Sequence, residues 1–120
     1  RQAHQDSVNS VSFSPDGTLF ATGSSDETIR LWVAETDEFW RTLKGHSDEV
    51  FSIAFSPDGQ LLASGDDEGS VKLWNPRTGH ELRRLDRHSQ TVYDLDFSPD
   101  GSYLASCGFD GAVWLWGVPA

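Results

Sequence analysis

A histidine, a hydroxyl residue, an acidic residue and a tryptophan recur together three times along this 120-residue chain. The three sets are His4, Thr22, Asp26 and Trp32; His46, Ser64, Glu68 and Trp74; and His88, Ser106, Asp110 and Trp116. A carboxylate that orients a histidine, which in turn activates a hydroxyl, is the arrangement of a serine hydrolase. A catalyst needs one such site, so three copies at identical spacing favour a structural hydrogen-bond network. Buried polar groups need partners of this kind. We therefore expect no catalytic residue, with a hydrolase as the alternative.

Metal binding is the second chemistry that these residue types could support. The repeated histidines lie far apart, without a local pair such as His-x-x-x-His, which argues against zinc. The run Asp66–Asp67–Glu68 lacks the alternating oxygen ligands of a calcium loop and is read as a solvated turn. No phosphate-binding glycine loop is present. We expect no metal and no cofactor, and a metal-dependent enzyme is the alternative.

The elements that must position these side chains are repeats. The tetrapeptide Ser-Pro-Asp-Gly begins at residues 14, 56 and 98, so each copy follows the last by 42 residues. The histidines and the Leu-Trp pairs keep the same spacing. A fixed period of this length is the signature of a repeat architecture. We expect one unit over residues 1–120, with repeats at approximately 4–45, 46–87 and 88–120.

Within each repeat the hydrophobic pattern alternates every second residue, which is typical of strands. The segments VNSVSFS, VFSIAFS and VYDLDFS precede Ser-Pro-Asp-Gly, whose Pro, Asp and Gly favour a turn. Two further strands and a weaker fourth, at 38–43 and 81–85, follow in the first two repeats. The third repeat lacks this outer strand, so its edge is open to strand addition. We expect an all-β chain of antiparallel strands.

Charge and cysteine content narrow the classes of partner. Nine Lys and Arg against 19 Asp and Glu give a net charge of −10. Such a surface repels phosphate backbones and anionic lipids, so we expect no nucleic acid and no membrane partner. The single cysteine, Cys107, cannot form an internal disulfide. We expect an intracellular, cytoplasmic location. The chain contains no methionine, which favours a segment of something longer or a trimmed chain.

The pattern GHxxxVxxVxFSPDG followed by LASGSxDxTIxLW resembles the WD40 repeat, the blade of WD40 β-propellers. The resemblance covers the whole chain three times and departs from the family at the Trp-Asp pair, which reads Trp32–Val33, Trp74–Asn75 and Trp116–Gly117. It implies a non-catalytic protein-interaction scaffold. It also implies that acid, histidine, hydroxyl and tryptophan form one hydrogen-bond chain within each blade. Because Glu68 is one methylene longer than Asp, the second network is expected to be the distorted one.

The resemblance further implies a face on which a peptide or protein ligand docks. The residue after the first valine of each repeat and the residue before the network acid belong to that face. They are Asn9, Phe51 and Tyr93, and Ser25, Asp67 and Phe109. The aromatic members are candidate anchors, although Phe51 and Tyr93 could instead line the channel. The nearby acids Asp6, Asp48, Glu49 and Asp67 would favour a basic peptide.

Three blades cannot close a ring, because propellers have about four to eight. Apolar residues at both ends should then lack a partner within the chain. We expect these to be Val11, Phe13 and Ile29 at one end, and Phe97, Leu104 and Val113 at the other. A partial propeller closed by oligomerisation follows, as a homo-oligomer with a six-bladed dimer preferred to a nine-bladed trimer. A longer parent chain that supplies the missing blades is the other possibility.

Overall fold

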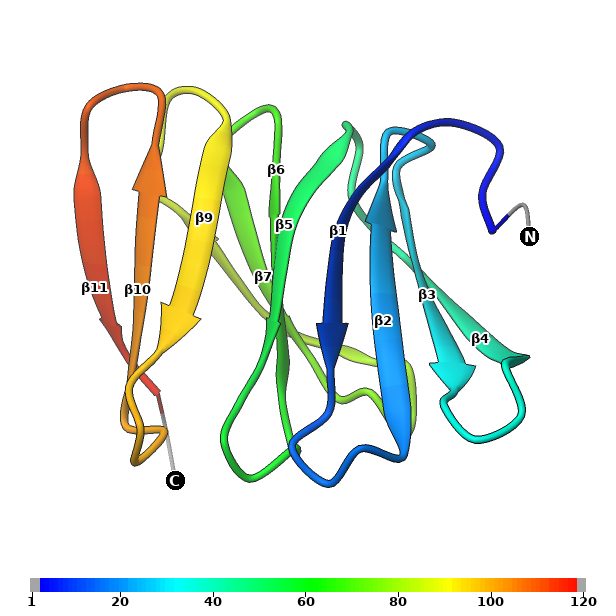
Figure 1. The fold of residues 1–120 in the computed structure, drawn as a ribbon. Coiled ribbons are helices and arrows are strands. Elements are labelled where there is room, and N and C mark those ends of the chain that lie inside the picture. The colour runs from blue at the N-terminus through cyan, green and yellow to red at the C-terminus, as the bar shows by residue number, and fades with distance from the viewer. Residues whose placement is uncertain (1–2, 119–120) are drawn as a thin grey trace.

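The computed structural model describes residues 3–118 as antiparallel strands joined by turns and loops (Figure 1). The ends of the predicted unit, residues 1–2 and 119–120, lie outside this part. The strands are β1 (Val8–Phe13), β2 (Leu19–Ser24), β3 (Thr28–Val33), β4 (Glu38–Lys44), β5 (Val50–Phe55), β6 (Leu62–Asp66), β7 (Ser70–Trp74), β8 (Glu81–Asp86), β9 (Val92–Phe97), β10 (Tyr103–Gly108) and β11 (Val113–Gly117). Among these residues there is no helix long and apolar enough to cross a membrane.

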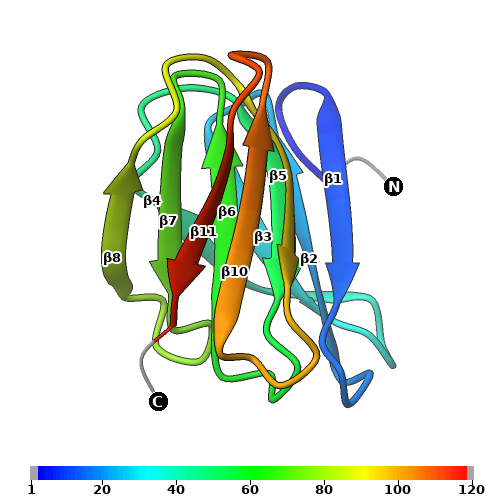
Figure 2. The same ribbon diagram turned by 90° about the vertical axis from the view of Figure 1, so that its left-hand side faces the viewer.

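The strands form three separate sheets, each a meander of consecutive strands. The first sheet contains β1–β4, the second β5–β8 and the third only β9–β11. The three sheets lie side by side in chain order, and Figure 2 shows β10 and β11 nearest the viewer, in front of the second sheet. The predicted all-β class, with three blades and a three-stranded third blade, is confirmed. Closure by oligomerisation stays a prediction.

Each Ser-Pro-Asp-Gly segment forms the predicted turn between the first two strands of its sheet. In the first turn Gly17 has φ 75°, a conformation that glycine adopts without strain. The Asp16 carboxylate accepts hydrogen bonds from the Thr18 N–H and from the Ser14 and Thr18 hydroxyls. These bonds, with the Thr18 N–H foremost, lower the pKa of Asp16 to about 2. The turn is therefore locked by side-chain hydrogen bonds as well as by glycine.

Two hydrophobic cores join the sheets, one at each sheet-to-sheet contact. The first core comprises Leu19, Ala21, Ile29, Leu31 and Leu43 from the first sheet and Val50, Ile53, Phe55, Leu62 and Trp74 from the second. The second core joins the second and third sheets through Ala54, Leu61, Ala63, Val71, Leu73, Leu85, Val92, Leu95, Phe97, Leu104, Trp116 and Val118. At both joints the earlier sheet thus contributes a face of aliphatic residues, and the later sheet contributes a face that also contains Phe and Trp.

The strands of neighbouring sheets approach each other closely at two glycines. A Cβ atom at Gly23 would lie 2.8 Å from Val50 Cγ1, and one at Gly65 would lie 2.5 Å from Val92 Cγ1. A hydrogen bond also links the second and third sheets beside Gly65: the Ser52 hydroxyl donates to the Val92 carbonyl at 3.2 Å. The absence of a side chain at each glycine therefore makes room for the valine of the next sheet.

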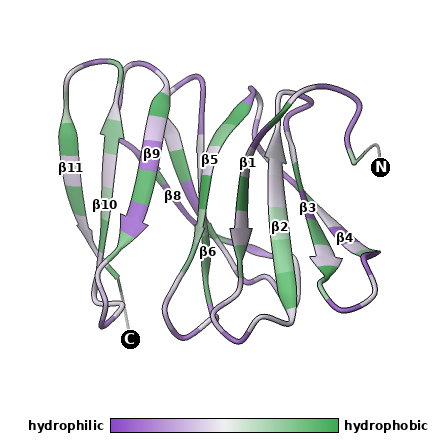
Figure 3. Ribbon diagram, viewed as in Figure 1, coloured by the Kyte–Doolittle hydropathy of each residue, from purple (hydrophilic) through white to green (hydrophobic). Residues whose placement is uncertain are grey.

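The predicted bare ends need a correction. Ile29, Leu104 and Phe97 are buried, because these residues face the second sheet and belong to the two cores. Val11, Phe13 and Val113 are exposed as expected. Figure 3 shows hydrophobic residues along β11 and in the upper part of β1, on the two outermost sheets. Both ends therefore expose an apolar face, but only half of the residues predicted for them lie there.

The Gly65–Val92 contact leads to a stability prediction. Gly65→Ala should lower the free energy of unfolding by about 1–3 kcal/mol, because the added methyl group overpacks the joint. Gly117→Ala is the matched control, since a Cβ there meets no atom within 4 Å. Chemical denaturation of both variants measures the difference. Equal stability of the two variants would contradict the close approach.

Candidate functional site

The first predicted network is present within the first sheet. The Trp32 indole N–H donates to Thr22 Oγ1 at 3.1 Å. Thr22 Oγ1 lies 2.6 Å from His4 Nε2, and His4 Nδ1 lies 2.9 Å from the Asp26 carboxylate. The Thr22 hydroxyl accepts from the indole and donates to the imidazole, whose Nδ1–H donates to Asp26. In this direction every member of the chain uses its hydrogen-bonding groups.

The third sheet repeats this geometry in a looser form. The Trp116 indole N–H donates to Ser106 Oγ at 3.0 Å, and Ser106 Oγ lies 2.8 Å from His88 Nε2. His88 Nδ1 lies 3.3 Å from both oxygens of Asp110. The carboxylate also accepts from the Ser89 N–H at 2.8 Å. Asp110 therefore divides its acceptor atoms between the histidine and the backbone.

The second network contains Asp66 in place of the predicted Glu68. Trp74 donates to Ser64 Oγ at 2.7 Å, and Ser64 Oγ lies 2.5 Å from His46 Nε2. His46 Nδ1 then lies 2.7 Å from Asp66 Oδ2. Glu68 is exposed, and its carboxylate accepts a hydrogen bond from the Ser47 hydroxyl at 3.1 Å. The assignment of Glu68 to the network was wrong, and so was the expectation that its length distorts that network.

The strand register explains this exchange of acids. Asp66 ends β6 and occupies the position that Ser24 holds in the first sheet. There Ser24 Oγ accepts the Asp26 N–H at 3.0 Å, and here the Asp66 carboxylate accepts the Glu68 N–H at 3.0 Å. A carboxylate on a buried strand end needs strong donors, and His46 is close enough to be one. The two acids Asp66 and Glu68, only two positions apart, were the signal in the sequence that two assignments were possible.

The network carboxylates are held in their ionised form. Burial on its own raises the pKa of Asp26, but hydrogen bonds from Thr28, the Gln5 N–H and His4 outweigh it and lower the pKa to about 2. Asp66 shows the same balance, and its pKa is lowered chiefly by the His46 hydrogen bond against a large effect of burial. The Ser89 N–H is the main cause that lowers the pKa of Asp110 to about 2.

The hydroxyls of the networks are poorly placed for nucleophilic attack. Thr22, Ser64 and Ser106 are all buried, and each hydroxyl lies between an indole N–H and an imidazole nitrogen. A substrate carbonyl would have to displace a tryptophan to reach any of them. The arrangement is suited to tying a loop to two strands of one sheet, because the histidine lies in a loop, the hydroxyl on the second strand and the tryptophan on the third.

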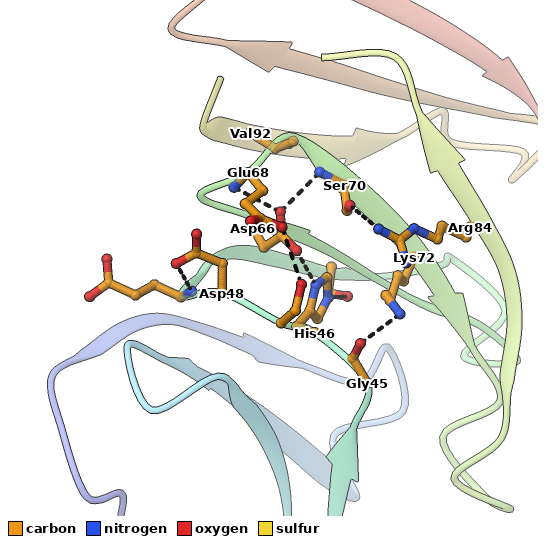
Figure 4. A network of polar contacts seen from close by, with 12 residues as sticks. Gly45, His46, Asp48, Asp66, Glu68, Ser70, Lys72, Arg84 and Val92 are labelled. Atoms are coloured by element: carbon orange, nitrogen blue, oxygen red, sulfur yellow. Dashed lines mark hydrogen bonds and ion pairs between the residues drawn. The ribbon is translucent and has the colours of Figure 1, made fainter. Parts of the chain in front are cut away.

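A buried lysine extends the polar contacts of the second sheet. Lys72 Nζ lies 2.8 Å from the Gly45 carbonyl and 2.6 Å from Glu81 Oε1. Figure 4 shows Lys72 reaching Gly45 beside the His46–Asp66 pair. The ammonium group thus holds the segment before His46 against β7. Sequence analysis missed this residue, because a lysine within an alternating strand is ordinarily a solvated one.

The residues predicted for a docking face lie at one edge of the molecule. The starts of β1, β5 and β9 and the loops β2–β3, β6–β7 and β10–β11 share the upper edge in Figure 1. The Asn9 amide donates to Ser25 Oγ and to the Val50 carbonyl, both at 3.0 Å, so Asn9 joins two sheets. The rings of Tyr93 and Phe109 lie 5.0 Å apart, and both residues are exposed.

The remaining two residues of that face differ from these pairs. Phe51 is half-buried, and Asp67 accepts a hydrogen bond from the Thr91 hydroxyl. Carboxylate oxygens of Asp48, Glu49 and Asp67 all lie within 4.8 Å of one another. These three acids are the described residues whose spacing could hold a cation, and they give this edge a negative charge.

A chain of meander sheets, each with one buried histidine–hydroxyl–tryptophan link, is a repeat scaffold of propeller blades. This chain belongs to the WD40 family: the pattern described as "WD domain, G-beta repeat" matches residues 1–33, 38–75 and 79–117. The family is generally non-catalytic.

Curated relatives share single stretches with the chain. It is 48% identical over 44 residues to nuclear distribution protein nudF 2 of Penicillium rubens, which is 37% of this chain and 10% of the relative. It is 46% identical over 43 residues to nuclear distribution protein PAC1 of Tuber melanosporum, 36% of the chain and 10% of that protein. The ribosome biogenesis protein WDR12 homolog of Drosophila sechellia is 51% identical over 37 residues, 31% of the chain and 9% of the relative. The matched stretch spans about a tenth of each relative.

The exchange of acids in the second network can be tested by substitution. Asp66→Ala leaves the His46 Nδ1–H and the Ser70 and Glu68 N–H groups without their acceptor. We expect a loss of about 3 kcal/mol in the free energy of unfolding. Glu68→Ala is the matched control and should change it by about 0.5 kcal/mol or less, as exposed substitutions do. A larger loss for Glu68→Ala would restore the original assignment.

The lowered pKa values predict loss of stability in acid. Asp26 titrates at about 2 in the folded chain and at 3.8 when unperturbed, so the unfolded chain takes up its proton first as the pH falls. The free energy of unfolding should therefore decrease between about pH 4 and pH 2. Denaturation at a series of pH values measures the slope. In Asp26→Asn the slope should be shallower than in the unsubstituted chain, and an unchanged slope would contradict this origin.

Proposed function

We propose that the chain is a non-catalytic interaction scaffold that binds a peptide or protein at the edge carrying Tyr93 and Phe109. One observation carries the proposal. Tyr93 and Phe109 are 59% and 61% exposed, although their rings contact each other. Two adjacent rings that leave this much apolar surface in water are suited to anchoring a partner, because aromatic residues dominate binding hot spots.

Charge supports a basic partner for this edge. Asp67 accepts a hydrogen bond from the Thr91 hydroxyl, and the Thr91 carbonyl accepts one from the Phe109 N–H at 3.1 Å. Thr91 therefore connects the acidic residues to the aromatic pair. Three close carboxylates attract a cationic segment, and the net charge of −10 acts in the same direction. A lysine- or arginine-containing peptide would place its charge by the acids and its aliphatic chain against the rings.

The proposal includes self-assembly of the three blades into a closed ring. Apolar residues on both outermost faces support it, because exposed patches of this kind on soluble proteins usually mark interaction sites. Two copies give six blades, within the usual range, whereas three copies give nine. Further blades of a longer parent chain would close the ring equally well. An intracellular, cytoplasmic setting suits a chain whose single cysteine is free.

A peptide array tests the prediction that this edge binds a basic peptide. Arrays of lysine- and arginine-containing peptides, with acidic versions as counterparts, are probed with the labelled chain. We expect binding to basic peptides, and a loss of about tenfold or more in affinity in Tyr93→Ala/Phe109→Ala, equivalent to about 1.4 kcal/mol. Leu82→Ala removes an exposed apolar residue from β8 and is the control. Equal binding by both variants would contradict the anchor role.

A further inference from the structure

The exposed face of the first sheet repeats a surface that is buried elsewhere in the same chain. We call Val8, Val11 and Phe13 the β1 end face. Val11 is 61% exposed, whereas Ile53 and Leu95, at the same position of the next two repeats, are 7% and 5% exposed. Val8 and Phe13 are also exposed, and their counterparts are buried. The fold thus covers this kind of surface with the preceding sheet wherever one is present.

The outer face of the third sheet is the complementary half of such a joint. We call Tyr103, Val113 and Leu115 the β11 end face. These residues lie on β10 and β11, and Figure 2 shows no chain in front of these two strands. Val113 is 74% exposed, while Ile29 and Val71 at the same position are fully buried. A hollow of about 110 Å³ adjoins it, between Ala105, Cys107 and Val113. On the first two sheets the equivalent surface is covered by residues of the following sheet. They are Val50 and Ile53 at the first joint, and Val92 and Leu95 at the second.

We propose that the β11 end face of one copy receives the β1 end face of a second copy, and that Cys107 and Asp94 make this joint looser than the two within the chain. The first half rests on the self-assembly of the proposed function, and the second half names what controls it. The contact is head-to-tail, and two such joints close a ring of two copies when the three blades of each copy turn through half a circle.

Cys107 alters the closest point of the joint. It holds the position of Gly23 and Gly65, and it pairs with Val113 as Gly65 pairs with Val71. At both glycines an added Cβ would lie within 2.8 Å of the incoming valine. Cys107 carries that Cβ and a sulfur atom, so Val8 of a second copy cannot approach as closely as Val92 does to Gly65. The sheets must separate there, and buried contact is lost.

Asp94 alters the hydrogen bonding at the same joint. It stands where Ser10 and Ser52 stand in the earlier repeats, and it pairs with Cys107 in the register. Ser10 Oγ accepts the Ile53 N–H at 3.3 Å, and the Ser52 hydroxyl donates to the Val92 carbonyl. An ionised carboxylate can accept from the Val11 N–H, but it cannot donate to the Val8 carbonyl. One of the two kinds of cross-joint hydrogen bond is therefore lost.

Four chains tested over a concentration series by sedimentation equilibrium separate the two halves of the proposal. The unsubstituted chain should move from 13.3 kDa towards twice that mass as concentration rises. Val11→Asp places a charge on the β1 end face, at a position exposed in the single chain, and should remain at 13.3 kDa. Cys107→Gly/Asp94→Ser restores the residues of the internal joints and should lower the dissociation constant at least tenfold. Leu82→Asp, on exposed β8, is the control and should match the unsubstituted chain.

Each other outcome overturns a defined part. If the unsubstituted and Cys107→Gly/Asp94→Ser chains both stay at 13.3 kDa, the second copy is excluded, and the self-assembly of the proposed function falls with it. If the unsubstituted chain doubles its mass but Cys107→Gly/Asp94→Ser binds no more tightly, only the role of Cys107 and Asp94 is overturned. If Val11→Asp, with an unchanged circular dichroism spectrum, still doubles its mass, the β1 end face is not the contact. A mass of three copies would replace the two-copy ring.

Discussion

The constraint on which this structure depends is that a sheet of short strands has two faces and can bury neither by itself. Each joint between sheets meets the constraint in the same way, with a valine of one sheet resting over a glycine of the sheet before it. Val50 over Gly23 and Val92 over Gly65 bring the backbones together, and the surrounding aliphatic residues then fill the two cores. The contacts are between neighbours only, as in other repeat proteins, so stability grows with each added joint.

The buried networks meet a different need, which is to hold the strands of one sheet together. A tryptophan on the third strand and a hydroxyl on the second are linked to a histidine in the loop before the first strand. Because a half-satisfied network is costly in a buried site, its geometry selects one register of the strands. The acid at the end of the network can come from either of two positions, as Asp26 and Asp66 show, provided that the histidine is reached.

The features common to all three repeats could be predicted from the sequence, whereas a feature that differs in a single repeat could not. The strand positions, the turns at Ser-Pro-Asp-Gly and the three-stranded third sheet follow from periodicity and turn chemistry, which are local properties. Which face of its sheet a residue lies on depends on the packing of the sheets and is not a local property. Ile29 and Leu104 were assigned to bare ends, but both face the second sheet. Asp66 was missed because equal spacing pointed to Glu68, although burial decides which of two nearby acids meets the histidine.

The departures from the repeat indicate where the molecule is free to vary. At the edge that carries Asn9 and Tyr93, equivalent positions do different things: Asn9 donates hydrogen bonds to Ser25 and, across a joint, to the Val50 carbonyl, whereas the ring of Tyr93 packs on that of Phe109. Neither choice touches the tryptophan–hydroxyl–histidine chain beneath it. A scaffold whose stability lies in glycines, valines and buried networks can therefore exchange its edge residues at small cost. Recognition by this chain is expected to depend on exposed edge residues such as Tyr93 and Phe109, because neither belongs to a hydrophobic core or to a buried network.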